Sequence, residues 1–341
     1  MAERILITRT DRLGDVVLST PVIKHLRALY PQAYIAFMVR PENRDVVTNN
    51  PYLDEVIVYD KYGSEKSFWK TFKFALDLKK KKFDLAIALH PTNRVHTMLF
   101  LAGVPVRVGY NRKMGKLLTK RITHFKQEGQ KHEVDYNFDL LKEAGFETEG
   151  ADRMPFMKTS EDERRLVDAL LKDVSLGNNI IALHVGASCP SKRWPAEGFS
   201  EAADMLAGKY GSQIALVGGD ETVAFSREVL DAMKNKAVDL TGTLLIGELA
   251  EFLSRCRLFI SNDSGPVHVA VAVGTPVVVI FGRQEAGLSP RRWGPLGDKD
   301  KVLHKEVGCH VCLAHNCDKD FKCLKAVTAA EVVESAEKIL G

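Results

Sequence analysis

The chain has 341 residues, enough for two globular domains of roughly 150 residues each. Its apolar fraction of 45% and charged fraction of 27% are typical of a folded globular protein, and a net charge of +4 gives no strong reason to expect a nucleic-acid partner. The longest apolar stretch, 267–281, is broken by a histidine, a glycine and a proline and is too short to span a bilayer. Because Met1 leads into residues 5–7 without a long apolar leader, we expect a cytoplasmic protein whose membrane contacts are peripheral.

The first half of the chain alternates predicted strands with predicted helices. Apolar runs predict strands over 5–7, 34–39, 55–59, 84–89 and 106–110. Helical spacing predicts helices over 15–29, 46–49, 68–80, 90–102 and 132–144. Residues 111–132 form a predicted basic loop, and 79–82 are four consecutive lysines. Such basic runs either lie on a solvated face or contact an anionic partner. The segment 111–132 suits a membrane surface or phosphorylated sugars better than nucleic acid.

Residues 145–155 show neither a strand pattern nor a helix pattern, and we interpret them as a link between domains 1–150 and 151–341. The second half then repeats the alternation of strands and helices. Predicted strands cover 180–185, 213–217, 258–260 and 277–281, and predicted helices cover 160–171, 198–209, 222–233, 246–254, 265–273 and 329–340. This order predicts an α/β protein with two doubly wound, Rossmann-like domains facing a cleft. Ligands then bind at the carboxyl ends of the strands. The last helix is a candidate to pack back on the first domain.

The turn over 9–15 lies between the first strand and the first helix. It holds a single glycine, so the dinucleotide-binding fingerprint is absent. Asp15, at the mouth of the helix, suits a general base that accepts a proton from a hydroxyl. The alternative is that Asp15 only caps the helix.

Two turns in the second half combine small residues with charge. Residues 184–195 form a Gly/Ser loop that ends in Lys192 and Arg193, a composition that suits a phosphate, although a solvated loop is equally compatible. In 218–221 two glycines precede Asp220 and Glu221. These acids either accept hydrogen bonds from ribose hydroxyls or merely begin the next helix.

The segment 256–270 runs from an apolar strand through a polar turn into a helix that opens at Gly265. Backbone N–H groups and the helix dipole at such a turn can hold a phosphate or a sugar hydroxyl. The alternative is that Asp263 or Ser264 only caps the helix. His268, one turn into the helix, belongs to the same predicted site.

Four cysteines cluster near the end of the chain, with two, four and five residues between successive members: Cys309, Cys312, Cys317 and Cys323. Disulfides are disfavoured in a cytosolic protein, so four thiols in one segment indicate either a zinc or iron–sulfur site or reduced packing cysteines. The spacing fits neither the paired zinc pattern nor the ferredoxin patterns.

Taken together, three stretches resemble the ADP-heptose:lipopolysaccharide heptosyltransferase family, glycosyltransferase family 9, which has the two-domain GT-B fold. They are 10–21, with Leu13-Gly14-Asp15; 186–195, with Lys-Arg-Trp-Pro; and 261–268 followed by Gly-Thr-Pro at 274–276. Their order and separation match the family's, and they cover most of the chain.

The resemblance implies a donor site in the second domain and an acceptor site in the first. Ser188 and Lys192 would contact the donor pyrophosphate, although Ala187 stands where a relative has a hydroxyl. Glu221 or Asp220 would bind the ribose. Asp263 would hold donor-sugar hydroxyls, with Ser264, Gly265 and His268 near the phosphates. Arg12 and Arg94 would face an anionic, lipid-anchored acceptor such as inner-core Kdo at the inner face of the inner membrane.

The family inverts the anomeric centre with ADP-heptose as donor and without an obligatory cofactor or metal, so the resemblance implies Asp15 as catalytic base. Two alternatives stay open. One is a transferase or epimerase that uses another nucleotide sugar, which competition between ADP and UDP would reveal. The other is a non-catalytic nucleotide-sugar or metal-binding protein, with the four cysteines as the metal site.

Overall fold

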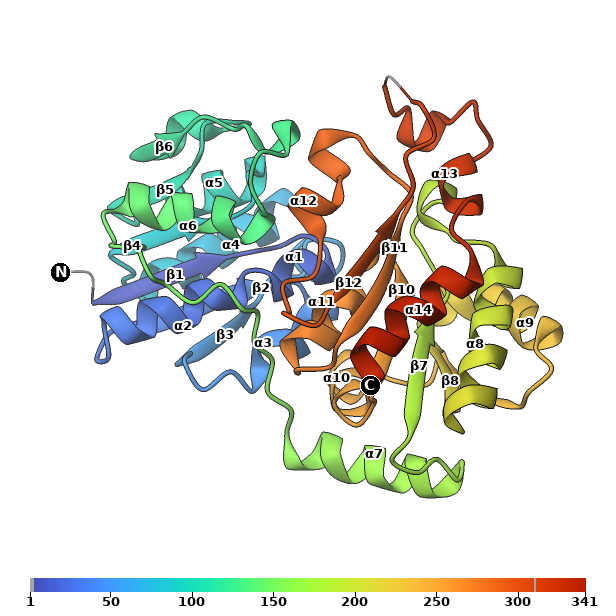
Figure 1. Cartoon of the computed structure of the whole chain (residues 1–341). Coiled ribbons are helices and arrows are strands. Elements are labelled where there is room, and N and C mark those ends of the chain that lie inside the picture. Colours follow the sequence, from blue (N-terminus) through green and yellow to red (C-terminus); the bar gives the residue numbers. More distant parts are fainter. Residues whose placement is uncertain (1–2, 310) are drawn as a thin grey trace. The chain divides into compact units, whose positions relative to one another are not determined.

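The computed structural model describes residues 3–309 and 311–341. The chain divides into two compact units, unit 1 over Met1–Lys158 and unit 2 over Thr159–Gly341, where the sequence suggested a division after residue 150. Within the described residues, each unit contains a six-stranded parallel sheet with helices around it (Figure 1). The predicted doubly wound α/β class is therefore confirmed.

Unit 1 has its strands in the order β3-β2-β1-β4-β5-β6. The strands are β1 (Arg4–Thr8), β2 (Tyr34–Val39), β3 (Glu55–Val58), β4 (Leu85–Ala88), β5 (Val106–Tyr110) and β6 (Lys120–Ile122). The helices are α1 (Leu13–Val17), α2 (Thr20–Leu29), α3 (Asp45–Thr48), α4 (Phe68–Lys80), α5 (Asn93–Leu101) and α6 (Glu133–Ala144), with single 3-10 turns η1 (Pro41–Asn43), η2 (Gly115–Leu117) and η3 (Lys126–Glu128).

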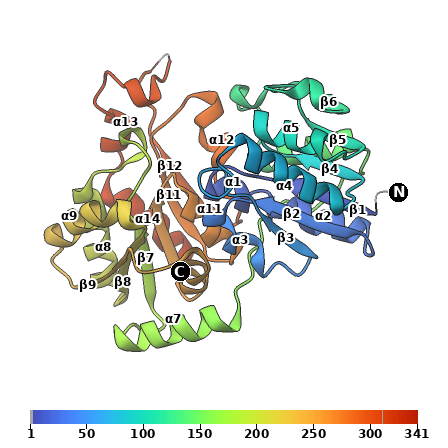
Figure 2. The same ribbon diagram turned by 180° about the vertical axis from the view of Figure 1, so that it is seen from behind.

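Helices cover both faces of the unit 1 sheet because β2 and β4 are apolar throughout and β1 is apolar from Ile5 to Ile7. In β1, Leu6 packs in the cluster formed with α4 and α5, whereas Ile5 and Ile7, which point to the opposite face, are fully buried as well. Helix α4 packs beside α5 (Figure 2), and the contacts between elements place α2 beside α6.

Unit 2 repeats the topology, with the order β12-β11-β10-β7-β8-β9. Its strands are β7 (Ile180–His184), β8 (Gln213–Gly218), β9 (Ala237–Thr241), β10 (Leu258–Asn262), β11 (Val277–Phe281) and β12 (Lys301–His304). Its helices are α7 (Glu161–Asp173), α8 (Ala196–Tyr210), α9 (Val223–Ala232), α10 (Ile246–Ser254), α11 (Gly265–Ala272), α12 (Pro290–Trp293), α13 (Lys322–Lys325) and α14 (Ala329–Leu340), with 3-10 turns η4 (Pro190–Lys192), η5 (Asp220–Thr222), η6 (Ala286–Leu288) and η7 (Ala314–Asn316).

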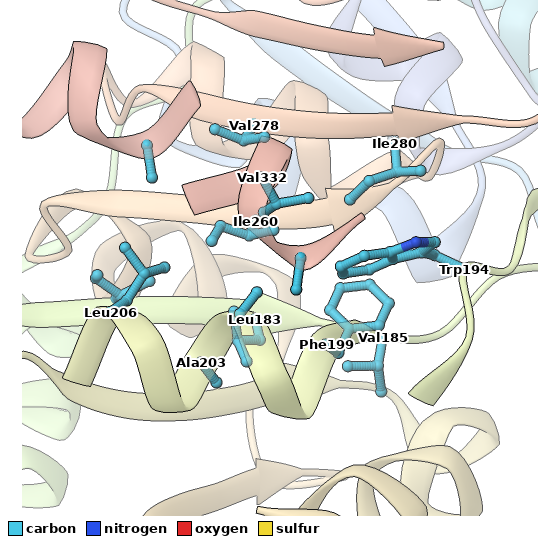
Figure 3. Close-up of a cluster of buried hydrophobic side chains, with 14 of the residues drawn as sticks. Leu183, Val185, Trp194, Phe199, Ala203, Leu206, Ile260, Val278, Ile280 and Val332 are labelled. Carbon is cyan, nitrogen blue, oxygen red and sulfur yellow. The ribbon is translucent and has the colours of Figure 1, made fainter. Parts of the chain in front are cut away.

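One core cluster of unit 2 lies between its sheet and the helices α8 and α14 (Figure 3). Trp194 and Phe199 meet edge to face in this cluster, with 4.8 Å between ring centroids. Leu183, Ile260 and Val332 reach the same cluster from β7, β10 and α14. The last helix thus packs on the sheet of its own unit.

The direction in which strands are added to each sheet reverses between β1 and β4 in unit 1 and between β7 and β10 in unit 2. We call these places switch point 1 and switch point 2. The loops at the carboxyl ends of the two strands diverge there, and doubly wound proteins bind ligands in the resulting crevice.

The structure corrects several local predictions. The single helix expected over 15–29 is two helices, and Pro21 lies in the first turn of the second, where its missing N–H does no harm. The basic segment 111–132 is only partly a loop, because it contains β6, η2 and η3, and Lys126 within it is buried. Strands β9 and β12 were not predicted, since their partly exposed residues lack a continuous apolar run.

Candidate functional site

At switch point 1, the loops after β1 and β4 meet through a carboxylate and an imidazole. Nδ1 of His90, just beyond β4, lies 3.0 Å from Oδ2 of Asp11, just beyond β1. The backbone oxygen of Asp11 accepts a hydrogen bond from Nδ2 of Asn43 at 2.9 Å, and Nζ of Lys61 donates to the oxygen of Thr10 at 2.8 Å. Loops from four neighbouring strands therefore converge on the end of β1.

The guanidinium of Arg9 is the centre of this site, and its side chain is only 2% exposed. Its Nε donates to Oδ1 of Asp11 at 2.8 Å, and its Nη2 pairs with the carboxylate of Asp15. Nη1 donates to Oε1 of Glu133 and to Oδ1 of Asn137, both at 3.1 Å. One buried cation thus holds carboxylates from the β1 loop, α1 and α6 in fixed positions.

Glu133 is fully buried and is shared between two cations, because Nζ of Lys126 lies 2.5 Å from the same Oε1 atom. The network around Arg9 therefore contains three carboxylates (Asp11, Asp15, Glu133) and two cations (Arg9, Lys126). Within these ion pairs the carboxylates outnumber the arginine and lysine cations by one, with His90 beside Asp11 and Lys61 beside Thr10 at their edge. A surplus of carboxylates in a poorly solvated place favours uptake of a proton.

Asp15 is the carboxylate whose proton affinity is raised. Burial is the largest influence and raises the pKa of Asp15 to about 6, with the Asp11 carboxylate acting in the same direction and the Arg9 guanidinium opposing it. Burial also favours the neutral form of Asp11, but Arg9 and His90 outweigh it and lower the pKa of Asp11 to about 2. The pKa values of two carboxylates on one guanidinium are thus shifted in opposite directions, upward for Asp15 and downward for Asp11.

Asp15 does not cap its helix, so the alternative interpretation of this residue is wrong. The N-cap of α1 is Arg12, and Asp15 lies in the first turn with 14% of its side chain exposed. A partly exposed carboxylate whose pKa lies near the working pH is suited to accept a proton from a bound hydroxyl.

At switch point 2, the contacts between the two strands are mostly neutral. Nδ1 of His184, at the end of β7, lies 3.2 Å from the hydroxyl of Ser264 and 3.3 Å from that of Ser261. Burial lowers the pKa of His184 to about 4, so its imidazole is neutral at pH 7. Ser264 is the N-cap residue of α11, but its side chain makes no capping hydrogen bond. The interpretation that Asp263 or Ser264 serves only as a cap is therefore wrong.

Asn262, the last residue of β10, fastens the loop that follows β7. Its Nδ2 donates to the backbone oxygen of Val185 at 2.8 Å, and its Oδ1 accepts from the backbone N–H of Trp194 at 2.9 Å. The indole Nε1 of Trp194 donates to the oxygen of Val327 at 2.9 Å. Both ends of the 186–193 loop are thus tied to buried structure.

Two cations share one carboxylate at the edge of switch point 2. Nζ of Lys192 lies 3.1 Å from Oδ2 of Asp263 and donates to the Asp263 backbone oxygen at 2.9 Å. Nη2 of Arg283, which follows β11, donates to the same Oδ2 at 2.7 Å. Two cations against one carboxylate leave a positive charge in a largely buried place, and burial lowers the pKa of Lys192 although Asp263 opposes this. Such an excess suits an anionic ligand.

Gly282 permits the close approach of the two loops that supply these cations. A Cβ at this position would lie 2.7 Å from the backbone oxygen of Ser191 and 2.6 Å from Cγ of Leu324. The residue before Arg283 and the residue before Lys192 are therefore in contact, which only glycine allows without displacing backbone.

The four clustered cysteines line a single pocket of about 250 Å³ in unit 2, together with Arg283, His304 and Lys305 among others. None of the four forms a disulfide, and Sγ of Cys323 donates to the oxygen of Gly282 at 2.9 Å. Within residues 3–309 and 311–341, no group of three or more His, Cys, Asp or Glu side chains is placed to hold a metal ion.

Comparison with known proteins identifies the family. The model of glycosyltransferase family 9 (heptosyltransferase) matches residues 71–322, about three quarters of the chain. The chain belongs to glycosyltransferase family 9. It is 25% identical over 350 residues to lipopolysaccharide heptosyltransferase 2 of Escherichia coli K12, covering 99% of this chain and 98% of that protein.

Solved structures agree with the family 9 assignment. A glycosyl transferase family 9 protein from Veillonella parvula superimposes with a TM-score of 0.90 at 28% identity, over 99% of this chain and 97% of that one. The E. coli ADP-heptose lipopolysaccharide heptosyltransferase II superimposes with a TM-score of 0.82 at 24% identity, over 99% and 98% of the two chains, and this likeness supports the fold alone. The family 9 chain thus has the expected GT-B fold.

The other predicted residues of the family 9 chain lie in more open surroundings. Arg12, Ser188, Asp220 and Glu221 are exposed, whereas Gly265 is half-buried and His268 is buried in the first turn of α11. Arg94 is exposed at the start of α5 and donates to the backbone oxygens of Lys61 and Lys66 at 2.9 and 2.8 Å. The structure brings Lys192 and Asp263 into direct contact. Among the described residues, neither Arg12 nor Arg94 takes part in the ion pairs around Arg9.

Sequence reasoning missed Arg9, Asp11, His90, Glu133 and Arg283. Arg9 and Arg283 each follow a buried strand within two residues, a position at which a charged residue is a useful signal. Glu133 had no such signal, because it reaches switch point 1 from a helix more than one hundred residues away in the sequence.

Proposed function

We propose that this chain is an inverting heptosyltransferase that transfers heptose from ADP-heptose to the inner core of lipopolysaccharide, with Asp15 as catalytic base. Family membership supports heptosyl transfer. The names of its relatives, lipopolysaccharide heptosyltransferase 2 and ADP-heptose lipopolysaccharide heptosyltransferase II, support this acceptor and this donor. The observation that carries the proposal is the Asp15 carboxylate, partly exposed and with its pKa raised to about 6 in a buried ionic network.

In the proposed reaction, the acceptor hydroxyl oxygen attacks the anomeric carbon of the heptose. The bond between that carbon and the diphosphate oxygen breaks, and its electron pair leaves with ADP. Asp15 takes the hydroxyl proton, and attack opposite the leaving group inverts the anomeric centre. Arg9 keeps the Asp15 carboxylate in place, while the excess negative charge around it keeps the carboxylate basic enough to accept the proton.

Lys192 and Arg283 would stabilise the diphosphate as it leaves. Their charges exceed that of Asp263 by one, so an additional anion restores the balance. The N-terminus of α11, with Ser264, Gly265 and His268, would contribute backbone N–H groups and its dipole. Ser188 would contact the pyrophosphate, Glu221 or Asp220 the ribose, and Asp263 the donor-sugar hydroxyls. The proposal requires no metal ion.

The acceptor side of the proposal uses Arg12 and Arg94 for the anionic groups of a lipid-anchored saccharide, consistent with a cytoplasmic protein at the inner face of the inner membrane. Both guanidinium groups are exposed. The Arg94 guanidinium keeps donors beyond the two used on Lys61 and Lys66, since it has five.

The decisive experiment follows transfer and donor binding separately. Wild type and Asp15→Asn are incubated with ADP-heptose and a soluble Kdo-containing acceptor, and ADP release is measured alongside calorimetric titration with ADP, UDP and GDP. We expect selective ADP binding in both proteins and a loss of turnover of about a hundredfold or more in Asp15→Asn. Near wild-type turnover in the variant would exclude Asp15 as the base, and preference for UDP would favour a transferase or epimerase that uses another nucleotide sugar.

A further inference from the structure

The outer face of α4 combines exposed aromatic side chains with lysines. Phe68 and Trp69, at the start of the helix, are 70% and 76% exposed and meet edge to face with 5.8 Å between centroids. A tryptophan this exposed contributes nothing to the core of unit 1. Contiguous exposed apolar side chains on a folded domain indicate a contact surface.

The charge on this face is strongly positive. Residues 66–82 contain seven lysines and a single acid, Asp77. On the helix itself, Trp69, Lys73, Leu76 and Lys80 follow one another at intervals of three or four residues, so they form one outward stripe. All four are exposed, whereas Ala75 and Leu78, on the opposite side, are buried.

We propose that this face of α4 docks unit 1 on a bilayer rich in anionic phospholipid. Exposed aromatic rings sit well at the level of lipid headgroups, and lysines beside them are attracted by an anionic surface. In the described part of the chain, no helix has the length and apolarity to cross a bilayer. The proposal deepens the proposed function and rests on it for the acceptor, which must be reached in a membrane.

The loop that leads into α4 also reaches switch point 1. Lys61 donates to the oxygen of Thr10 at the end of β1, and Arg94 holds the oxygens of Lys61 and Lys66. The carboxylate of Asp60 accepts backbone N–H groups from 63 and 64, so the loop is hydrogen-bonded at both ends. The loop that carries Lys61 and Lys66 thus joins α4 to the end of β1 within the same unit.

The basic segment 111–132, where the sequence suggested membrane contact, fits less well. Lys126 is buried in the Arg9 network, and the exposed cations of the segment have one exposed large apolar neighbour, Phe125, among the described residues. Helix α4 offers two adjacent aromatic rings and a denser lysine run, so we place the docking surface there.

The test measures binding to vesicles without donor or acceptor. Full-length protein is mixed with vesicles of phosphatidylglycerol and phosphatidylethanolamine or of phosphatidylcholine alone, and binding is followed by sedimentation and by tryptophan emission. We expect binding only to the anionic vesicles, with a blue shift that is lost in Trp69→Phe. Lys73→Gln/Lys80→Gln, which removes both lysines of the stripe, should bind about thirtyfold more weakly, since each lysine near the surface contributes about fivefold.

A charge-matched control is Lys234→Gln/Lys236→Gln, two exposed lysines of unit 2, which should bind as wild type. Thermal unfolding of all variants checks that they fold. Equal binding by the α4 variant and wild type, or equal binding to neutral vesicles, would overturn the proposal. A blue shift that appears on concentrating the protein without lipid would show an interface between copies and would overturn it as well.

The same proteins separate this proposal from the proposed function. The α4 variant should transfer heptose to a soluble acceptor at the wild-type rate and lose activity only toward an acceptor embedded in vesicles. Wild type that binds anionic vesicles but transfers nothing to the soluble acceptor would contradict the proposed function and leave the docking surface standing.

Discussion

The two units have the same strand order, yet the ion pairs at their switch points have opposite balances of carboxylates and cations. Switch point 1 gathers three carboxylates around two cations, and switch point 2 gathers two cations around one carboxylate. An excess of negative charge raises the proton affinity of a carboxylate, whereas an excess of positive charge attracts a phosphate. The topology therefore fixes where a ligand can bind, and the side chains at the strand ends determine what chemistry is possible there.

The two networks also differ in how far they depend on one residue. Arg9 contacts every carboxylate of its network, whereas at switch point 2 Lys192 and Arg283 both reach Asp263, so either can compensate part of its charge. The first network should fail as a whole when its centre is removed, and the second should weaken stepwise.

The largest effect is expected from Arg9→Met. This change removes the partner that three buried or half-buried carboxylates share, although Glu133 keeps Lys126 and Asp11 keeps His90. Breaking a buried ion pair costs on the order of 3–5 kcal/mol. Urea denaturation should show a loss of that size in the free energy of unfolding. Arg12→Met, at an exposed position three residues away, should change it by less than about 0.5 kcal/mol. Similar losses in both variants would contradict a central role for Arg9.

Lys192→Met should weaken ADP binding by about tenfold to a hundredfold, because a charge-assisted hydrogen bond to the diphosphate is lost while Arg283 keeps part of the positive charge. Calorimetric titration gives the dissociation constant. Lys209→Met, an exposed lysine of α8, is the matched control and should bind ADP as wild type. An unchanged constant in Lys192→Met would place the diphosphate elsewhere.

Two substitutions within switch point 1 should have opposite effects on stability. The folded-state pKa of Asp15 lies above its ordinary value, so its contribution to stability is present in acid and is lost as pH rises through about 6. Asp15→Asn should therefore stabilise the protein at pH 7.5, on the order of 1–3 kcal/mol, and have almost no effect at pH 4.

The folded-state pKa of Asp11 lies below its ordinary value. Its contribution to the stability of the folded protein is therefore present above pH 4 and is lost as pH falls through about 2. Asp11→Asn should destabilise the protein at pH 7.5. Urea denaturation of both variants across pH 4 to 8 checks the pair. Destabilisation by Asp15→Asn at neutral pH would mean that its bond to Arg9 outweighs the repulsion among the carboxylates.

The smallest effect is expected from Gly282→Ala. The added methyl group would lie 2.7 Å from the backbone oxygen of Ser191, so this backbone must move, which shifts Lys192 relative to Arg283. ADP affinity should fall severalfold, while the acceptor-side properties of unit 1 stay unchanged. Gly208→Ala, in α8 with open space around its Cβ, is the control. Equal affinities in both variants would show that the spacing of the two cations is not critical.

Much of the fold could be predicted from the sequence, because a parallel strand buried on both faces consists of consecutive apolar residues, as in β4 and β11. Edge strands β9 and β12 could not be predicted, since half-exposed residues give no such run. Asp15 and Lys192 were found because they lie in turns directly after strands. Arg9 and Glu133 were not, because an ion pair between residues 124 positions apart depends on how α6 packs against the sheet.

The contacts of Trp194 limit how far the 186–193 loop can open. Its indole ring packs in the unit 2 core, its backbone N–H is bonded to Asn262, and Lys192 lies two residues before it. Opening the 186–193 loop at that end would expose a large aromatic side chain, so it should occur only with partial unfolding of the unit. Amide hydrogen exchange at Trp194 should then be as slow as in β10, and the loop that carries Lys192 would receive its nucleotide as a rigid, preformed surface.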